Sequence, residues 1–263
     1  MNGEAFVAPE DFVPARAQNE APQRGRLIIA SCRSGSYLAS KAVARYRSRL
    51  ATRGSEAEVP FLRNIDRDFS DTETCVRLDL HVGGCDVFLF QCLYNPVLGY
   101  SVNQNYMAFL IAARTFKEHG ARHVTGLLPY LAYGRQDKPT RFMREPTTAK
   151  LMADLSLVAG MDRLVTWHPH SGQIHGFYGK VPVHTLEALS LFADEFRRFG
   201  GREEVAVVAP DAGASKFVTY VGRKLDLRSA IAAKYRPEPE KARVSEVIGD
   251  LAAKRVAIVF DDM

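Results

Sequence analysis

Short apolar runs alternate along this chain with longer stretches in which apolar residues recur every three or four positions. The short runs are typical of buried strands, and the longer spacing is typical of amphipathic helices. The pattern predicts strands at 26–31, 86–91, 124–128, 164–166, 205–209, 229–233 and 256–260, and helices at 37–50, 103–119, 147–160, 185–198 and 215–225. Such alternation favours the α/β class, in which helices cover both faces of parallel sheets.

The length of the chain predicts more than one folded unit. With 263 residues it exceeds the usual size of a single domain, so we expect two α/β domains. Residues 1–25 are rich in Ala, Pro, Glu and Gln and predict a mobile tail. We place the first domain at 26–180 and the second at 181–263, because a Gly-Lys-Val-Pro connection lies within 178–183.

Charge and composition narrow the classes of partner. The 35 basic and 30 acidic residues give a formal charge of +5, which suits small anionic substrates as well as nucleic acid. No dense Lys/Arg run favours nucleic acid, and the longest apolar runs are too short to span a membrane. The four cysteines form no Cys-x-x-Cys pair and no signal peptide is evident, so we expect a soluble, cytoplasmic protein.

One loop carries candidate phosphate-binding chemistry. The segment at 128–150 follows an apolar strand and begins Leu-Pro-Tyr-Leu-Ala-Tyr-Gly-Arg-Gln-Asp-Lys. Arg135 and Gln136 in this loop could bind phosphate oxygens, because a guanidinium fork matches phosphate geometry. Taken alone, the segment is equally compatible with a basic surface loop that binds nothing.

Five further segments accompany this loop in a fixed order. They are Phe-Ser-Asp-Thr-Glu-Thr at 69–74, Thr-Trp-His-Pro-His-Ser-Gly-Gln-Ile-His-Gly-Phe at 166–177, Pro-Asp-Ala-Gly-Ala-Ser-Lys at 210–216, Lys-Tyr-Arg-Pro at 234–237, and an apolar strand with two acids at 256–263. Together with the loop, they resemble the motifs of ribose-phosphate diphosphokinases, the synthetases of phosphoribosyl pyrophosphate. The resemblance covers residues 26–263 and implies two phosphoribosyltransferase-like domains.

The resemblance implies how the nucleotide is bound. Phe69 would stack on adenine, while Asp71 and Glu73 would recognise the base and sugar. In the family this segment serves the active site of a neighbouring subunit, so a homo-oligomer, either a dimer or a hexamer, is expected. Arg135 and Gln136 would hold the phosphates of ATP.

The same resemblance implies the remaining roles. His170 and Asp211 would serve a Mg²⁺ ion, which usually keeps several waters. Lys234 and Arg236 would stabilise the transition state of diphosphoryl transfer as fixed cations. Ribose 5-phosphate would contact Arg236 and two acids near the end of the chain, Asp261 and Asp262. The implied reaction makes phosphoribosyl pyrophosphate and AMP from ATP and ribose 5-phosphate.

The chain departs from the family pattern at three places. His168 stands where the family has an Asp, which removes a negative charge near the cation. Ala-Ser-Lys-Phe at 214–217 departs from the usual Gly-x-x-Arg. The sequence stops at Met263, where the family continues into a phosphate-cradling loop, so we expect a truncated chain with an incomplete second domain.

These departures keep two alternative functions open: a catalytically silent homologue that assembles with an active synthetase, and a phosphoribosyltransferase. A zinc site at His168, His170 and His175 is disfavoured, because no Cys or carboxylate lies in register with them.

Overall fold

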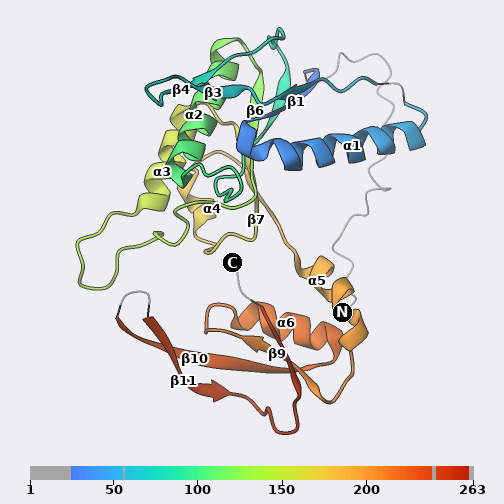
Figure 1. Ribbon diagram of the computed structural model, residues 1–263, viewed down its shortest axis with the longest axis vertical. Helices are drawn as coiled ribbons and strands as arrows, with labels where there is room; N and C mark the ends of the chain where they lie inside the picture. The colour runs from blue at the N-terminus through green and yellow to red at the C-terminus, as the bar shows by residue number, and fades with distance from the viewer. Residues whose placement is uncertain (1–24, 56, 239–240, 261–263) are drawn as a thin grey trace.

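The structure is a computed structural model that describes residues 25–55, 57–238 and 241–260. It has two α/β units, one above the other in Figure 1, and the chain passes between them once, ahead of α5 (Leu189–Glu195). The α/β class predicted from the pattern of apolar residues is therefore confirmed. The predicted tail, apart from Gly25, lies outside the described residues.

The first unit is built on a six-stranded sheet in which every neighbouring pair is parallel. Its order is β2-β1-β5-β6-β7-β8, so the sheet grows in both directions from β1 and β5. The strands are β1 (Leu27–Ser31), β2 (Phe61–Arg63), β5 (Asp86–Phe90), β6 (His123–Leu128), β7 (Arg163–Trp167) and β8 (Val183–Leu186). In parallel sheets of this kind, ligands bind beyond the carboxyl ends of the strands.

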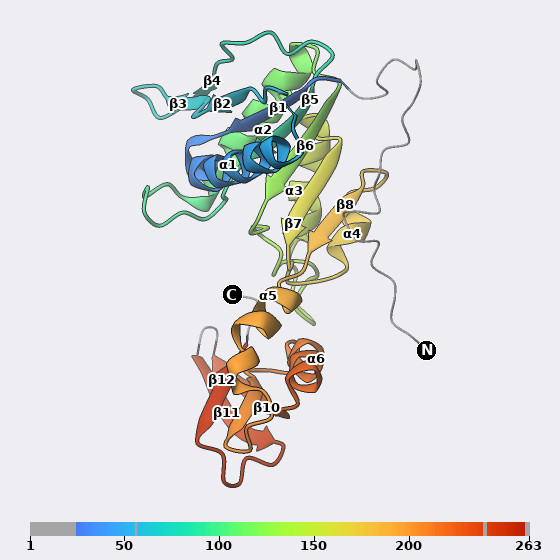
Figure 2. The same cartoon turned by 90° about the vertical axis from the view of Figure 1, so that its right-hand side faces the viewer.

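Helices cover both faces of this sheet, as Figure 2 shows. One face packs on α2 and α3 and the other on α1, with a short 3₁₀ turn (Arg33–Gly35) leading into α1. The helices are α1 (Ser36–Thr52), α2 (Val102–Glu118), α3 (Thr148–Val158) and the short α4 (Ile174–Phe177). Helix α2 begins with a capping box, in which the Ser101 hydroxyl accepts from Gln104 N and the Gln104 side chain accepts from Ser101 N.

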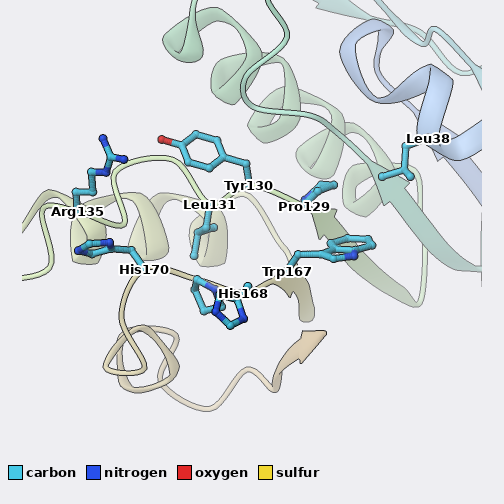
Figure 3. Close-up of a pocket in the computed structure, with 9 residues that line it drawn as sticks. Leu38, Pro129, Tyr130, Leu131, Arg135, Trp167, His168 and His170 are labelled. Atoms are coloured by element: carbon cyan, nitrogen blue, oxygen red, sulfur yellow. The ribbon is translucent and has the colours of Figure 1, made fainter. Parts of the chain in front are cut away.

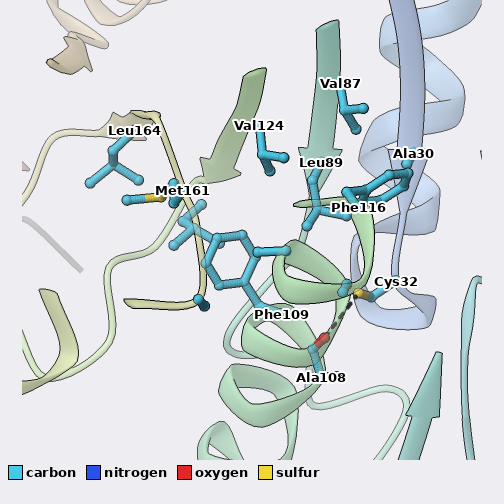
Figure 4. Close-up of a cluster of buried hydrophobic side chains, with 14 of the residues drawn as sticks. Ala30, Cys32, Val87, Leu89, Ala108, Phe109, Phe116, Val124, Met161 and Leu164 are labelled. Atoms are coloured by element: carbon cyan, nitrogen blue, oxygen red, sulfur yellow. Dashed lines mark hydrogen bonds between the residues drawn. The ribbon is translucent and has the colours of Figure 1, made fainter. Parts of the chain in front are cut away.

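The largest core lies between the sheet and α2. Phe109 and Phe116 are fully buried against Val87, Leu89 and Val124 of the central strands (Figure 4). The Cys32 thiol, also fully buried, donates to the Ala108 carbonyl at 3.8 Å. Burial of this scale fixes the carboxyl ends of β5, β6 and β7 as a rigid platform.

Beside the sheet, β3 (Asp66–Asp68) and β4 (Thr74–Val76) form an antiparallel hairpin. The hairpin projects from the first unit at the side away from the second unit (Figure 1). It carries the segment at 69–74 in its turn.

The second unit has a smaller, four-stranded sheet with the order β11-β10-β9-β12. Its elements are α5, a 3₁₀ turn (Arg197–Phe199), β9 (Val205–Ala209), α6 (Ser215–Leu225), β10 (Arg228–Glu238), β11 (Lys241–Ile248) and β12 (Val256–Val259). Helices α5 and α6 pack on one face, against Val205, Val207 and Ala209. Strands β10 and β12 run parallel to β9, whereas β11 is antiparallel to β10.

Three expectations about this region need correction. The helix predicted at 185–198 is replaced by the end of β8 and by α5, because Val183 and Thr185 alternate with more exposed residues in a strand pattern. The second sheet is not wholly parallel. The boundary placed at 180 precedes β8, which pairs with β7, so sheet pairing extends the first unit to Leu186.

Within the described ranges, no helix combines the length and the apolar character that crossing a membrane would require.

Candidate active site between the two sheets

Two loops of the first unit meet beyond the carboxyl ends of β6 and β7. Pro129 and Tyr130 follow β6 directly, and His168 follows β7. One backbone hydrogen bond links the two segments, with Trp167 N donating to Pro129 O at 3.1 Å, while Gly134 N donates to Leu131 O at 3.2 Å within the loop after β6. Residues predicted to bind ATP and metal thus come together because neighbouring parallel strands end at the same edge.

A cavity of about 440 Å³ lies between these loops and the start of α1. Its lining is predominantly apolar, and two of the predicted site residues, Arg135 and His170, stand at one end (Figure 3). The full set of lining residues is Leu38, Pro129, Tyr130, Leu131, Arg135, Trp167, His168, Pro169 and His170. The volume is within the range of natural small-molecule sites.

A second cavity of about 180 Å³ adjoins the first and reaches the second unit. It shares three residues with the first cavity, His168, Pro169 and His170. From the second unit come Asp211, Gly213, Ala214 and Phe217, which belong to the turn after β9 and the start of α6. The two predicted metal residues, His170 and Asp211, therefore line one cavity from opposite units.

The turn after β9 is organised by Asp211. Its Oδ1 accepts from Gly213 N at 2.9 Å and from Ala214 N at 3.3 Å. This local bonding shapes a strand-turn-helix junction of the kind that presents small residues to an anion. A larger residue than Gly213 would crowd the carboxylate, because its Cβ would lie 3.1 Å from Asp211 Oδ1.

His168 adopts an unusual backbone conformation at the centre of the site. Its φ is +35°, in the left-handed region that non-glycine residues rarely occupy. Its backbone N donates to Leu186 O at 3.1 Å, and its ring lies edge-on to Phe217, with 4.9 Å between the centroids. Such strain is typical of functional sites, and here it turns the chain so that both Trp167 and His170 reach the first cavity.

Asp137 is a buried carboxylate in the loop after β6. It is 5% exposed. Burial opposes ionisation of its carboxyl, but hydrogen bonds from Ser171 and Lys138, with the nearby charges of Lys138 and His170, outweigh this and lower its pKa. Lys138 Nζ lies 3.0 Å from Asp137 Oδ1. A buried carboxylate thus links the loop after β6 to the loop after β7.

The hairpin residues predicted to bind the nucleotide line neither cavity. Phe69 is 50% exposed in the turn between β3 and β4 and lines neither cavity. Asp71 Oδ1 accepts from Glu73 N at 3.1 Å, and Phe69 N donates to Glu73 O at 2.8 Å. Within this chain, the hairpin therefore does not join Arg135 and His170.

Other predicted residues are placed only in part. Gln136 is exposed on the loop, where its backbone O accepts from Ala149 N at 3.2 Å, and it lines neither cavity. Lys234 and Arg236 belong to β10, three and five residues after Ile231, which pairs with Ala209 at the end of β9. Their side chains, and the whole of Asp261 and Asp262, lie outside the described residues.

Several lining residues were not predicted from the sequence. Leu38, Pro129, Tyr130 and Trp167 form much of the first cavity, and Phe217 closes the second. One signal was available for Trp167, because the only tryptophan of the chain falls at the predicted end of a strand, where α/β sheets bind ligands.

Comparison with known proteins identifies the family of the chain. A family model described as the N-terminal domain of ribose phosphate pyrophosphokinase matches residues 27–160. The chain belongs to this family. The matched region contains the loop at 128–150 and the segment at 69–74, which are two of the six segments that suggested the resemblance.

Named relatives extend the likeness to the ribose phosphate pyrophosphokinase family beyond that region. The chain is 38% identical over 196 residues to the ribose-phosphate pyrophosphokinase of Fusobacterium nucleatum. The aligned region makes up 74% of this chain and 60% of that protein. It is 40% identical over 196 residues to the Clostridium acetobutylicum enzyme of the same name, covering 74% and 59%. The chain thus spans about three-fifths of the length of these relatives.

A solved structure shows the same fold. The crystal structure of phosphoribosylpyrophosphate synthetase from Mycobacterium smegmatis superposes with a TM-score of 0.75 and 31% sequence identity. The match covers 90% of this chain and 71% of that chain. Both α/β units therefore take part in the likeness.

Proposed function

We propose that the protein transfers the diphosphoryl group of ATP to O1 of ribose 5-phosphate, giving phosphoribosyl pyrophosphate and AMP. The observation that carries this proposal is the pair of adjoining cavities, which bring Arg135 and His170 of one sheet to Asp211 of the other. Such a meeting of two strand edges can hold two substrates next to each other. Membership of the ribose phosphate pyrophosphokinase family suggests which substrates these are.

The first unit would hold the phosphates of the donor. Arg135 follows β6 on an exposed loop, and its guanidinium can form two parallel hydrogen bonds to phosphate oxygens. Gln136, its exposed neighbour, would add a bond once the loop closes. Closure of this loop would also exclude water from the transferring group.

A Mg²⁺ ion fits the donor set as a partly protein-bound cation. Among the residues that the structure describes, no group of three or more His, Cys, Asp or Glu is arranged to enclose a metal. One carboxylate, Asp211, and one imidazole, His170, line the second cavity, and Mg²⁺ in phosphate-transferring sites takes most other ligands from phosphates and water. When bound, the ion would neutralise charge on the diphosphoryl group.

The transfer itself would break the bond between the α,β-bridging oxygen and the β-phosphorus while O1 of the ribose attacks that phosphorus. The protein's part is positioning and neutralisation of the phosphoryl oxygens. We assign Lys234 and Arg236 to this role, because both follow the carboxyl end of the β10 segment that pairs with β9. Asp261 and Asp262, which come after β12, would contact the ribose, with Arg236 serving its phosphate.

The exposed hairpin suggests a contribution from a second copy of the chain. Phe69, Asp71 and Glu73 are all exposed and separate from the cavities of their own chain. We propose that they face the nucleotide of a neighbouring subunit in a homo-oligomer. Sedimentation shows whether Phe69→Ala still assembles like the parent protein. Lower activity in a variant that still assembles would then report a loss of nucleotide contact.

The decisive experiment measures AMP formation by the purified full-length protein with ATP, Mg²⁺ and ribose 5-phosphate. Arg135→Ala should lower kcat/KM by about a hundredfold or more, as loss of one preorganised donor does in other transfer enzymes. Arg122→Ala is a matched control, since Arg122 is an exposed arginine at the opposite, amino end of β6. Absence of AMP above a protein-free blank would refute the proposal, and nucleotide binding without turnover would favour the silent homologue.

A further inference from the structure

The loop between β5 and α2 exposes a cluster of apolar side chains. Within residues 91–101, Val97 is 90% exposed, and Tyr94 and Leu98 are also exposed. Single apolar residues are normal on a protein surface, but three of them within five positions form a patch. Such a patch is typical of a surface that another molecule covers.

The loop is held in this exposed position by Asn95. The side-chain Oδ1 of Asn95 accepts from Val97 N at 3.1 Å and from Leu98 N at 3.4 Å, and its Nδ2 donates to Ser34 O at 3.3 Å. Asn95 also forms an isolated antiparallel bridge with Tyr100. Because these bonds fix the backbone, the apolar tip loses little conformational entropy when it binds a partner.

Arg33 ties this loop to the hairpin of β3 and β4. On one side, Arg33 Nη1 donates to the Tyr100 hydroxyl at 2.5 Å, and Arg33 Cζ lies 4.6 Å from the centroid of the Tyr100 ring. On the other side, Arg33 donates to Asp66 at 3.1 Å and to Asp68 at 2.8 Å, both in β3. The loop and the hairpin project toward the same side of the first unit in Figure 2. A partner that covers the hairpin therefore also meets the loop.

This surface is both apolar and acidic. The hairpin segment at 66–73 carries four acidic residues and one basic residue, and Asp71 and Glu73 are exposed. A partner surface should therefore combine apolar side chains with basic ones. We call the exposed set the hairpin face; it comprises Asp71, Glu73, Tyr94, Val97 and Leu98.

The loop at 128–150 carries the matching combination at its tip. Phe142 is 90% exposed, and Met143 beside it is also exposed. Residues 135–145 include four basic and two acidic residues, so the segment has the opposite charge to the hairpin. We call the tip the basic patch; it comprises Arg141, Phe142, Met143 and Arg144, all of them exposed.

The basic patch has a defined conformation of its own. The Glu145 carboxylate accepts from Thr140 N at 2.9 Å, and Thr140 O accepts from Met143 N at 2.9 Å. At the base of the loop, Ala149 N donates to Gln136 O at 3.2 Å. The loop extends outward beside the start of α3 (Figure 1), so its tip is presented to a partner.

We infer that the hairpin face of one copy docks against the basic patch of a second copy of the chain. Val97 and Leu98 would pack on Phe142, while the acids of the hairpin face the arginines of the patch. Each copy carries both surfaces, so a two-fold dimer forms the contact twice.

The inference rests on the proposed function at one point, the assignment of Phe69 to the nucleotide of a neighbouring subunit. The basic patch belongs to the same loop as Arg135, which would hold the phosphates of that nucleotide. Docking of the hairpin face there brings Phe69 of one copy toward the phosphate-binding loop of the other. The loop after β5 thus adds an apolar anchor to a contact that the hairpin alone would make mainly through charge.

Sedimentation velocity of the full-length protein tests the anchor. Val97→Asp puts a charge at the exposed tip, where no core packing is disturbed, and should raise the dissociation constant of the assembly about ten- to a hundredfold. Leu191→Asp is the control, because it adds the same charge at an exposed apolar position of α5 in the second unit. A parent protein that stays monomeric, or equal association of Val97→Asp and the parent, would overturn the inference.

Mixing two variants tests whether the contact joins different copies. Val97→Asp and Phe142→Lys should each associate poorly alone, because a charge then meets an apolar side chain in both contacts of the dimer. In a mixed dimer the new aspartate meets the new lysine, and the second contact keeps Val97 against Phe142. The mixture should therefore associate about tenfold more tightly than either variant alone. A mixture that associates no better than its components would refute the docking.

The sedimentation assays contain no substrates and require no turnover. If Val97→Asp breaks the assembly and the parent forms no AMP, the proposed function fails and the docking stands. If the parent forms AMP and Val97→Asp assembles normally, only the docking fails.

Discussion

His168 of the first unit packs edge-on against Phe217 of the second, with 4.9 Å between the ring centroids. Phe217 continues into an aromatic cluster with Phe192 at 6.0 Å and Phe260 at 5.6 Å. An imidazole therefore connects the loop after β7 to the core of the second unit, at the position where the ribose phosphate pyrophosphokinase pattern has a carboxylate. The chain has replaced a charge beside the proposed cation by a contact between its two units.

Restoring the carboxylate should strengthen cation binding. His168→Asp adds a negative charge to the cavity lined by His170 and Asp211, so the Mg²⁺ concentration for half-maximal AMP formation should fall several-fold. The lost ring contact should cost about 1 kcal/mol of unfolding free energy. A Mg²⁺ titration at fixed ATP measures the first effect, and urea unfolding the second.

His168→Asn is the matched control for this prediction, because it removes the ring without adding charge. It should show the same destabilisation and no gain in Mg²⁺ affinity. If His168→Asp and His168→Asn required the same Mg²⁺ concentration, the carboxylate would have no role as a cation ligand here.

Asp66 anchors the hairpin to the end of β1. It is 6% exposed, and its two oxygens accept from Arg33 N at 2.6 Å and Arg33 Nε at 3.1 Å. Asp66→Asn removes the charge and one acceptor, so we expect a loss of about 1 to 3 kcal/mol in unfolding free energy. Urea unfolding followed by circular dichroism measures it. Asp79→Asn, an exposed aspartate after the hairpin, should change stability by less than about 0.5 kcal/mol, and equal losses would contradict the anchoring role.

Asp137 gives a prediction with a defined pH dependence. Because its pKa is lowered in the folded protein, its ionised form stabilises the fold above the pKa of the unfolded chain, and this contribution is lost as the pH falls through the folded value. Asp137→Asn should therefore lose about 1 to 3 kcal/mol at pH 7, with the difference from the parent shrinking below about pH 4.

Unfolding free energies of both proteins between pH 3 and pH 8 measure this difference. A gap that persisted unchanged at the acid end would show that Asp137 acts through packing instead of charge.

The periodicity of apolar residues was enough to locate most of the fold. Strand β9 is a continuous apolar run and β6 is a mostly apolar, buried one, and α2 and α6 show helical spacing of apolar residues, so the positions of all four were predicted within two residues. The burial of one face or of the whole element sets its local pattern of apolar residues, so these elements can be predicted from the sequence.

Other elements depend on partners that are distant in the chain. Strand β2 has only three residues and exists by pairing with β1, and β11 exists by antiparallel pairing with β10. Likewise Leu38 and Trp167, 129 positions apart, share a cavity only because α1 crosses the sheet. Motif order could predict Arg135, His170 and Asp211, but the apolar lining has no motif of its own.

Gly35 provides the most stringent test of how α1 is placed. A Cβ at this position would lie 2.3 Å from Phe90 O and 2.8 Å from the Gln91 Cα, and backbone atoms of a central strand cannot move aside. Gly35→Ala should therefore push the start of α1 off the sheet and cost about 3 kcal/mol of unfolding free energy. Urea unfolding measures this cost.

The control is Gly176→Ala, because a Cβ on Gly176 in α4 meets nothing within 4 Å. It should be neutral or slightly stabilising, since alanine suits a helix better than glycine. Gly35→Ala should also weaken ATP binding, because Leu38 lies on the displaced first turn and lines the same cavity as Arg135 and His170. Normal stability with normal ATP affinity in Gly35→Ala would mean that α1 does not approach the sheet as closely as described.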